Sequence, residues 1–410
     1  MRNTDHKKDF PIFKNHRDLV YCDTAATTQT PQCVIEKITE YYSQYKSNVS
    51  RGIYPIAEQA TKEYEKTREK IATFINAKSK DEIVFTSGAT AGLNMLARTL
   101  TEKINPGDTI TYCNADHHAT ILPFQNLAKK TNTQIISLPL EKNTWTVTEK
   151  INPYVNKKTK LLILSHVSNV IGIKNPIESI IKKAKKINPA IITIIDAAQS
   201  IAHTKIDVQK IGCDALVFSA HKAYGPTGIG ALWVKENLLK TLKPDNYGGE
   251  MIETATTQTC APKKPPHRFE AGTPSIAEAI AWKSAIQYIE KIGIEKIEQH
   301  DKEITQETII ELKKTFEKNC TIIGPQNSKN RMNIISFTLK GAHSHDIAFH
   351  AGEEEICLRA GQHCAMPLHN EILHTPATLR ASFGIYNTKE DVKKMIKTIK
   401  KAYDIFKKRT

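Results

Sequence analysis

Lys222 lies in a Gly- and Pro-rich stretch, residues 219–230, between two short apolar runs. The runs at 215–218 and 231–234 are aliphatic and aromatic, which is typical of buried strands. Burial against a hydrophobic sheet disfavours a charged lysine and lowers the pKa of its amine. A neutral amine is a nucleophile toward carbonyl carbon. The stretch therefore predicts a lysine that forms a Schiff base, and a solvated lysine on a surface turn is the alternative that it leaves open.

Asp196 follows the apolar run 191–195 and so emerges where a predicted strand ends. A buried acid near a Schiff-base lysine suits the cofactor pyridoxal phosphate (PLP), because it pairs with the pyridine nitrogen and keeps the ring an electron sink. Ser219 and His221 flank Lys222 with groups suited to phosphate oxygens. Together these residues favour a PLP site, although Asp196 taken alone is more typical of a helix N-cap.

Residues 87–92, Ser-Gly-Ala-Thr-Ala-Gly, follow the predicted strand 83–85 and open a helix. The free N–H groups and the dipole of a helix N-terminus attract anions. The hydroxyls of Ser87 and Thr90 add donors. We expect the cofactor phosphate at this turn, and a helix start without a ligand is the alternative.

Two more polar segments follow predicted strands. His117, in Asp116-His117-His118-Ala119, can lie flat on a cofactor ring and exchange protons near neutral pH. A histidine pair can also bind metal, but no further ligand stands at metal spacing nearby, so we predict no metal site. Asn169, after the strand 161–165, can bind the cofactor's phenolic oxygen or the substrate; alone it is more typical of a loop asparagine.

Cys364 lies in a polar segment, residues 358–367, that is unlike a core strand. A cysteine beside His363 and near Arg359 can have a lowered pKa and act as a thiolate nucleophile. Arg380 can bind a carboxylate with its two-pronged guanidinium, and a surface arginine is the alternative. We expect a reactive thiol and a carboxylate clamp in this part of the chain.

Seven apolar runs alternate with helical stretches or long connections: 83–85, 109–113, 134–138, 161–165, 191–195, 215–219 and 230–234. Apolar strands that alternate with helices predict an α/β fold with a mostly parallel sheet covered on both faces. Ligands of such sheets bind at the carboxyl ends of the strands, where most of these motifs fall.

The rest of the chain divides around this sheet. Thr30 is expected to cap a helix with Pro31 at its first position, a second helix is expected near 57–76, and Thr388 is expected to cap the last helix. Residues 248–274 indicate a long irregular excursion or hairpin. We predict an N-terminal segment (1–20) packing near the small domain, a large cofactor-binding domain (21–275) and a small α+β domain (276–410) that carries the Cys364 loop.

The composition is that of an ordinary globular protein, with 410 residues, 40% hydrophobic residues and a net charge of +15. The lysines spread along helix faces without aromatic interleaving, so we expect a solvated surface and no nucleic-acid partner. No apolar run is long enough to span a bilayer. The eight cysteines form no CxxC pair, and the first fifteen residues are unlike a signal peptide, so we expect a cytoplasmic protein.

Two stretches carry a resemblance to a known family. The chain resembles the cysteine desulfurases of the class V aminotransferase superfamily, above all in residues 219–228, Ser-Ala-His-Lys-Ala-Tyr-Gly-Pro-Thr-Gly. Within that family, residues 359–367, Arg-Ala-Gly-Gln-His-Cys-Ala-Met-Pro, resemble the group II or SufS type. The resemblance runs from residue 21 to residue 387 and implies the PLP-dependent transferase fold type I.

The resemblance implies a role for each site residue. Lys222 would carry PLP, His117 would stack on its ring, Asp196 would meet the pyridine nitrogen and Gln199 the phenolic oxygen. The phosphate would be held by Thr90, Ser219 and His221, in a turn where Ala89 replaces the family's usual threonine. Gly272 and Thr273 would reach the phosphate of a neighbouring subunit, which implies a homodimer. Ser50 replaces a frequent histidine and Cys22 a common leucine.

The implied reaction converts L-cysteine to L-alanine and leaves a persulfide on Cys364 for a SufE- or SufU-like acceptor in iron–sulfur cluster assembly. Arg380 would hold the substrate carboxylate, with Arg359 and Asn169 also near the substrate. A selenocysteine lyase or another PLP lyase is an alternative. An inactive PLP fold that binds nucleic acid is a remote one.

Overall fold

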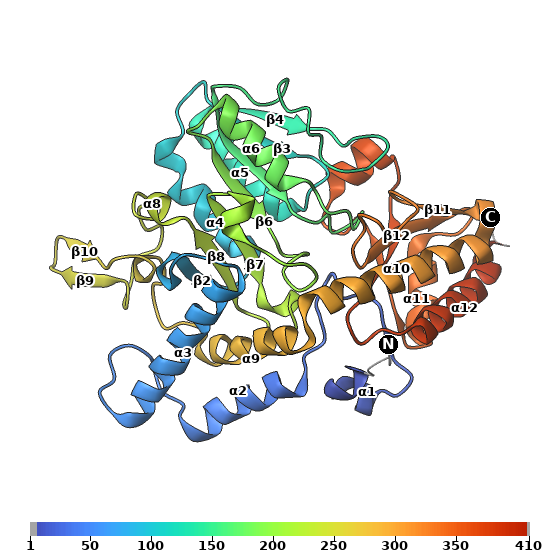
Figure 1. The fold of residues 1–410 in the computed structure, drawn as a ribbon, viewed down its shortest axis with the longest axis horizontal. Coiled ribbons are helices and arrows are strands. Elements are labelled where there is room, and N and C mark those ends of the chain that lie inside the picture. The colour runs from blue at the N-terminus through green and yellow to red at the C-terminus, as the bar shows by residue number, and fades with distance from the viewer. Residues whose placement is uncertain (1–5, 408–410) are drawn as a thin grey trace.

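The computed structural model describes residues 6–407. The outermost residues of the expected N-terminal segment and small domain, 1–5 and 408–410, lie outside the described residues. Figure 1 shows one broad part built around a large sheet and a smaller part that holds the C-terminal helices.

The large sheet has seven strands in the order β2-β8-β7-β6-β5-β3-β4. Its strands are β2 (Ile83–Thr86), β3 (Thr109–Cys113), β4 (Gln134–Leu138), β5 (Thr159–Ser165), β6 (Ile192–Asp196), β7 (Ala215–Ser219) and β8 (Gly230–Val234). Strands β3 to β7 pair in parallel, and β8 is antiparallel to both of its neighbours. The mostly parallel sheet predicted from the sequence is thus confirmed, with strand ends that differ by two residues at most.

Helices cover both faces of this sheet (Figure 1). In β5, Leu161 and Ile163 join the core under α4 (Ala89–Thr99) and α5 (His118–Thr131). Leu162 and Leu164 join the opposite core, which contains residues of α6 (Ile177–Ile187) and α9 (Ile276–Ile292). Because successive side chains of a strand point to opposite faces, both sets must be apolar, which explains the unbroken hydrophobic runs.

Two helices that pack beside α9 begin at residues that differ slightly from those expected. Helix α2 (Gln32–Gln44) begins one residue after Pro31, which is the N-cap with an extended backbone (ψ 156°). The expectation that Thr30 caps the helix is therefore wrong by one residue, because Pro31 lies outside the helical conformation. Helix α3 (Pro55–Phe74) carries its proline at the first helical position, which needs no N–H donor.

The smaller part is a four-stranded antiparallel sheet in the order β11-β12-β15-β14. It contains β11 (Cys320–Ile322), β12 (Ile334–Leu339), β14 (Arg359–Gly361) and β15 (Thr378–Ser382), with helices α10 (Ile294–Phe316), α11 (Ser344–Glu353) and α12 (Lys389–Phe406). Thr388 and Asp391 form the expected capping box at the start of α12.

The N-terminal chain crosses to this smaller part. Strand β1 (Val20–Tyr21) pairs in parallel with β13 (Ile356–Cys357). Lys7 Nζ lies 2.6 Å from a carboxylate oxygen of Asp391. Thr24 N–H donates to the Ser382 carbonyl in β15 and Thr28 N–H to the His221 carbonyl after β7, so residues 20–29 lie between the large sheet and the four-stranded sheet.

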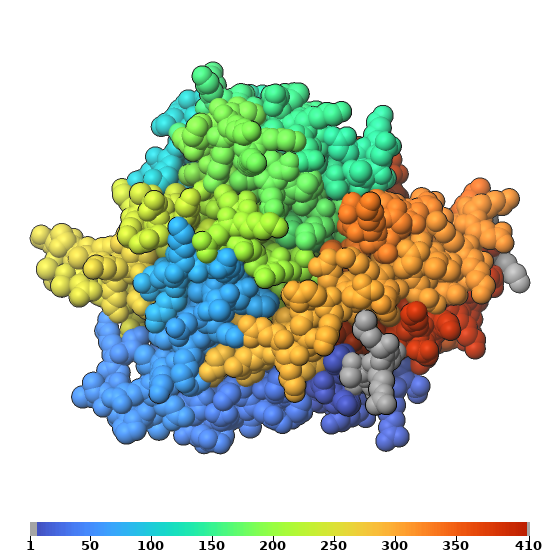
Figure 2. Space-filling model, in the orientation of Figure 1, coloured from blue at the N-terminus to red at the C-terminus, as the bar shows by residue number. Residues whose placement is uncertain are grey.

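The excursion at 248–274 contains a hairpin of β9 (Ile252–Ala255) and β10 (Cys260–Pro262). It projects from the molecule at the left of Figure 2. Short elements complete the fold: η1 (His6–Asp9), α1 (Ile12–Asn15), η2 (Lys80–Glu82), η3 (Thr101–Lys103), α7 (Val208–Ile211), η4 (Ala220–Lys222), α8 (Glu236–Leu239), η5 (His267–Phe269), η6 (Glu317–Asn319) and the π-helix η7 (Leu368–Leu373). Within residues 6–407 no helix combines the length and apolar character needed to cross a membrane.

Candidate active site

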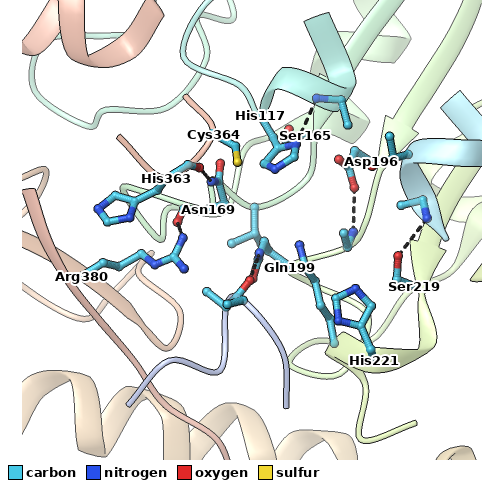
Figure 3. A pocket seen from close by; sticks show the side chains of 18 of the residues that line it. His117, Ser165, Asn169, Asp196, Gln199, Ser219, His221, His363, Cys364 and Arg380 are labelled. Carbon is cyan, nitrogen blue, oxygen red and sulfur yellow. Dashed lines mark hydrogen bonds between the residues drawn. The ribbon is translucent and has the colours of Figure 1, made fainter. Parts of the chain in front are cut away.

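A cavity of about 390 Å³ opens where the carboxyl ends of β5, β6 and β7 meet the smaller sheet. Figure 3 shows the side chains that converge on it. Twelve of the predicted site residues line it: Ala89, Thr90, His117, Asn169, Asp196, Gln199, Ser219, His221, Lys222, Arg359, Cys364 and Arg380. Residues as far apart in the sequence as Ala89 and Arg380, 291 positions, thus share one site. The volume of the cavity suits a small cofactor.

Lys222 is positioned by the turn that follows β7. Thr28 braces this turn, because its N–H and hydroxyl donate to the His221 carbonyl at 2.8 and 3.0 Å and its hydroxyl accepts from Tyr224 N–H at 2.8 Å. Burial lowers the pKa of Lys222, Asp196 opposes this shift and Arg380 adds to it. The lowered pKa favours the neutral amine that sequence reasoning expected.

Asp196 ends β6 with both carboxylate oxygens held. Oδ1 accepts from Ala198 N–H at 2.8 Å and Oδ2 from the Thr120 hydroxyl at 3.2 Å. Gln199 also lines the cavity, and its amide nitrogen donates to the Ala25 carbonyl at 2.9 Å. The acid is therefore fixed in orientation beside Lys222 before any ligand binds.

His117 is both the N-cap of α5 and a wall of the cavity. Its Nδ1 accepts from Ala119 N–H at 3.0 Å, so the proton of the neutral ring is on Nε2. Burial lowers the pKa of His117 to about 4, and the charge of Lys222 contributes to the lowering as the second largest cause. The ring is therefore neutral at pH 7 and is held by the helix start.

The opposite end of the cavity is suited to an anion. Ala89 N–H, at the start of α4, donates to Ser219 Oγ at 2.8 Å, so the Ser219 hydroxyl proton remains able to donate elsewhere. Thr90 and His221 lie beside it. Burial lowers the pKa of His221 to about 4, which leaves a neutral ring. A Cβ on Gly230 would lie 2.6 Å from Gly88 Cα, so glycine is required where β8 passes this turn.

Gly272 and Thr273 do not line this cavity. They line a separate hollow, of about 310 Å³, with Tyr64 and Phe85. Thr273 Oγ1 accepts from Asn48 Nδ2 at 3.5 Å. Glu270, just before them, is anchored by two hydrogen bonds from Arg68 at 2.6 and 2.9 Å.

Cys364 is exposed and lies between β14 and η7. His363 and Cys364 both have left-handed backbones, with φ of 51° and 57°. Asn169 Nδ2 donates to the His363 carbonyl at 2.6 Å, so this amide holds the thiol segment. Burial lowers the pKa of His363 to about 2, so the expectation that His363 helps a thiolate is wrong: a neutral ring carries no stabilising charge. Arg359, Arg380 and Lys222 each interact electrostatically with Cys364.

Asp23 joins the two arginines, and sequence reasoning missed it. Its oxygens accept from Arg359 Nε and Nη2 at 2.7–3.1 Å and from Arg380 Nη2 at 3.2 Å. Arg380 Nη1 donates to the Asn169 carbonyl at 3.0 Å, whereas its buried Nε has no hydrogen-bond partner within residues 6–407. The polar run 23–28 that contains Asp23 and Thr28 was the available signal, but it does not differ from an ordinary turn.

The comparisons with known proteins agree with this geometry. The family described as Aminotransferase class-V matches residues 20–395. A probable cysteine desulfurase of Halalkalibacterium halodurans is 41% identical over 404 residues, which cover 98% of each chain. A second one, from Streptomyces coelicolor, is 37% identical over 409 residues, which cover 98% of this chain and 97% of the relative.

Solved structures give the same grouping. The apo structure of a cysteine desulfurase from Thermococcus onnurineus has a TM-score of 0.92 and 35% identity, with 98% of each chain covered. The Escherichia coli cysteine desulfurase CsdA, in an S-sulfonic acid form, has a TM-score of 0.89 and 31% identity, with 99% of each chain covered. The family inferred from residues 219–228 is confirmed. The chain therefore belongs to the class V aminotransferase family, within its cysteine desulfurases.

Proposed function

We propose that this protein is a PLP-dependent cysteine desulfurase of the SufS type, which converts L-cysteine to L-alanine and keeps the sulfur as a persulfide on Cys364. One observation carries the proposal: the Lys222 amine and the Cys364 thiol line the same cavity, together with Asp196. An amine, an acid and a thiol in one site are the groups that carbon–sulfur cleavage with sulfur transfer needs.

The donors in the cavity fit PLP along its length. The α4 N-terminus, Thr90, Ser219 and His221 suit the phosphate, because they offer N–H and O–H donors at a helix start. Asp196 suits the pyridine nitrogen, the His117 ring suits the pyridine face, and the Lys222 amine suits the aldehyde. When bound, PLP supplies an electron sink that stabilises a carbanion at the substrate α-carbon.

The residues around the substrate have distinct tasks. The Lys222 amine, with its lowered pKa, takes the α-proton from cysteine and returns protons to the product. The buried Nε of Arg380, which is unpaired among the described residues, is the donor that a substrate carboxylate would satisfy. Asp196, which two hydrogen bonds keep in place, would keep the pyridine nitrogen of bound PLP protonated.

Cys364 removes the sulfur. Its thiolate attacks the substrate sulfur, an S–S bond forms, and the bond between that sulfur and the substrate Cβ breaks. The electron pair of the broken bond stays with carbon, which takes a proton to give alanine, and the thiol ends as a persulfide. Cysteine and one enzyme thiol thus become alanine and one persulfide, with no external oxidant.

The way the thiol is held supports delivery to a dedicated acceptor. The Cys364 carbonyl accepts from His118 N–H at 2.7 Å and the His363 carbonyl from Asn169 Nδ2 at 2.6 Å, so the segment is fastened at two successive residues. A fastened thiol has little reach, so the acceptor must come to it. We propose a SufE- or SufU-like acceptor that serves iron–sulfur cluster assembly, and a cytoplasmic homodimer in which Gly272 and Thr273 complete the partner's phosphate site.

The test uses the PLP-loaded protein with L-cysteine, an acceptor protein and dithiothreitol. Cys364→Ala should lose sulfide release, whereas Cys33→Ala and Cys260→Ala should keep it, because these two exposed thiols lie outside the cavity. Sulfide release from Cys364→Ala at the wild-type rate would refute the proposal. Parallel turnover of selenocysteine at a much higher rate would favour a lyase acting on selenium.

A further inference from the structure

His118 makes two contacts with the segment that carries Cys364. Its backbone N–H donates to the Cys364 carbonyl at 2.7 Å. Its ring Nε2 accepts from the backbone N–H of Met366 at 3.0 Å. The carbonyl of the thiol residue and the N–H two residues later are therefore both fastened to the first residue of α5.

The segment needs such fastening because its backbone is strained. Left-handed conformations are strained for non-glycine residues, and His363 and Cys364 adopt them in succession. Within the segment, Ala365 N–H donates to the Gln362 carbonyl at 2.8 Å, which closes a tight turn. Asn169 holds the His363 carbonyl from the other side. Contacts from α5 and from the loop after β5 thus hold the strained pair in place.

The ring of His118 is not needed for the helix that carries it. The N-cap of α5 is His117, whose Nδ1 accepts from Ala119 N–H. The His118 ring is half-buried, and burial lowers its pKa, so it is neutral at pH 7 and its Nε2 is an acceptor. Its hydrogen bond at this position is the one from the backbone N–H of Met366, a residue that is itself exposed.

We propose that the His118 imidazole is a positioning residue for sulfur transfer, which holds the Cys364 thiol over the cavity by accepting the Met366 N–H. This inference rests on the proposed role of Cys364. The inference gives the ring a part in one stage of the reaction only. The His118 ring promotes the attack of the thiol on the substrate sulfur, and it takes no part in cofactor binding or in removal of the α-proton.

The test compares PLP-loaded wild type with His118→Ala, His118→Gln and Leu122→Ala. Glutamine can place an oxygen where Nε2 lies and accept the same N–H. Leu122 lies one turn further along α5, is 53% exposed and has no polar side-chain group, so it is the matched control. Each variant is mixed once with L-cysteine, and two rates are followed: the early absorbance change of the cofactor and the appearance of persulfide on Cys364.

We expect His118→Ala to slow persulfide formation between about fivefold and about a hundredfold. The lower limit corresponds to the loss of one hydrogen bond, and the upper limit to a misplaced nucleophile. The early absorbance change should keep its rate, and His118→Gln should recover most of the loss. Leu122→Ala should match wild type.

Three results would overturn the inference: less than a twofold loss in His118→Ala, equal slowing of both stages, or a glutamine variant as slow as the alanine one. If His118→Ala loses PLP, His118→Gln is compared with His118→Asn instead, because the asparagine side chain is too short to accept the Met366 N–H. Equal rates of persulfide formation in these two variants would also overturn the inference. Absence of persulfide on Cys364 in the wild type would instead refute the proposed function.

Discussion

Arg380 should dominate the recognition of the substrate carboxylate, and Arg380→Lys tests this with the charge retained. Arg380 is 3% exposed, and its Nε is a buried donor for which the described part of the chain provides no partner. Its two terminal nitrogens already donate to the Asn169 carbonyl and to Asp23. A lysine keeps one charged donor but loses the two-pronged geometry, so at least one charge-assisted hydrogen bond to the carboxylate disappears.

The expected magnitude follows from that one bond. A hydrogen bond to a charged group contributes about 1.5–3 kcal/mol. Since about 1.4 kcal/mol is a factor of ten, kcat/KM for cysteine should fall about 10- to 150-fold. Because the interaction binds the substrate in both the ground state and the transition state, most of the loss should appear as a higher KM.

Arg359→Lys is the matched control. Arg359 donates to the same Asp23, but its side chain is 48% exposed and its donors on that side are already engaged. An exposed ion pair contributes about 0–1 kcal/mol, so the loss in kcat/KM should stay below about fivefold. The assay is initial alanine formation over a range of cysteine concentrations, with the thermal midpoint as a check on folding. A larger loss for Arg359→Lys than for Arg380→Lys, or less than a threefold loss for Arg380→Lys, would refute this reasoning.

Three further perturbations test the framework of the site. Burial lowers the pKa of His166 to about 3, so below pH 6.5 the unfolded chain binds a proton that the folded chain does not, and stability should fall as pH drops from 6.5 toward 3. Since His117 and His221 also have lowered pKa values, His166→Asn should make the thermal midpoint depend less steeply on pH over that range without removing the dependence. Gly230→Ala should weaken PLP binding by roughly 5- to 150-fold in a fluorescence titration, because overpacking costs about 1–3 kcal/mol where β8 meets the α4 turn. Gly249→Ala should leave PLP binding unchanged in the same titration, because a Cβ there meets open space. Arg68→Met should lower stability by about 3–5 kcal/mol, because Glu270 keeps a buried charge without its partner, and adding Glu270→Gln should restore part of the thermal midpoint.

The large sheet and its ligand end could be predicted because their signals are local. Each strand is a short apolar run with a polar residue at its end, as in β6 and Asp196. The order of five parallel strands then brings those ends together. Lys222, Asp196 and His117 were found in this way, since each follows a strand that the sequence makes visible.

The remaining features depend on contacts that no short stretch contains. Asp23 meets Arg359 across 336 positions, and Asn169 meets the His363 carbonyl across 194. The left-handed backbone at Cys364 is imposed by such partners and not by a glycine. The same limit explains why His363 was expected to help a thiolate, although its burial leaves a neutral ring. The domain boundaries and the role of Gly272 and Thr273 stay predictions.

The most direct test of the account is peptide mass mapping after PLP-loaded protein has reacted with one equivalent of L-cysteine. Each of the eight cysteines is blocked at the end of the reaction, and the mass of one additional sulfur atom is sought on every peptide. The account predicts that the sulfur is on the peptide with Cys364 and that alanine appears in equal amount. Sulfur on Cys33 or Cys260 in its place, or alanine formed while Cys364 stays unmodified, would contradict it.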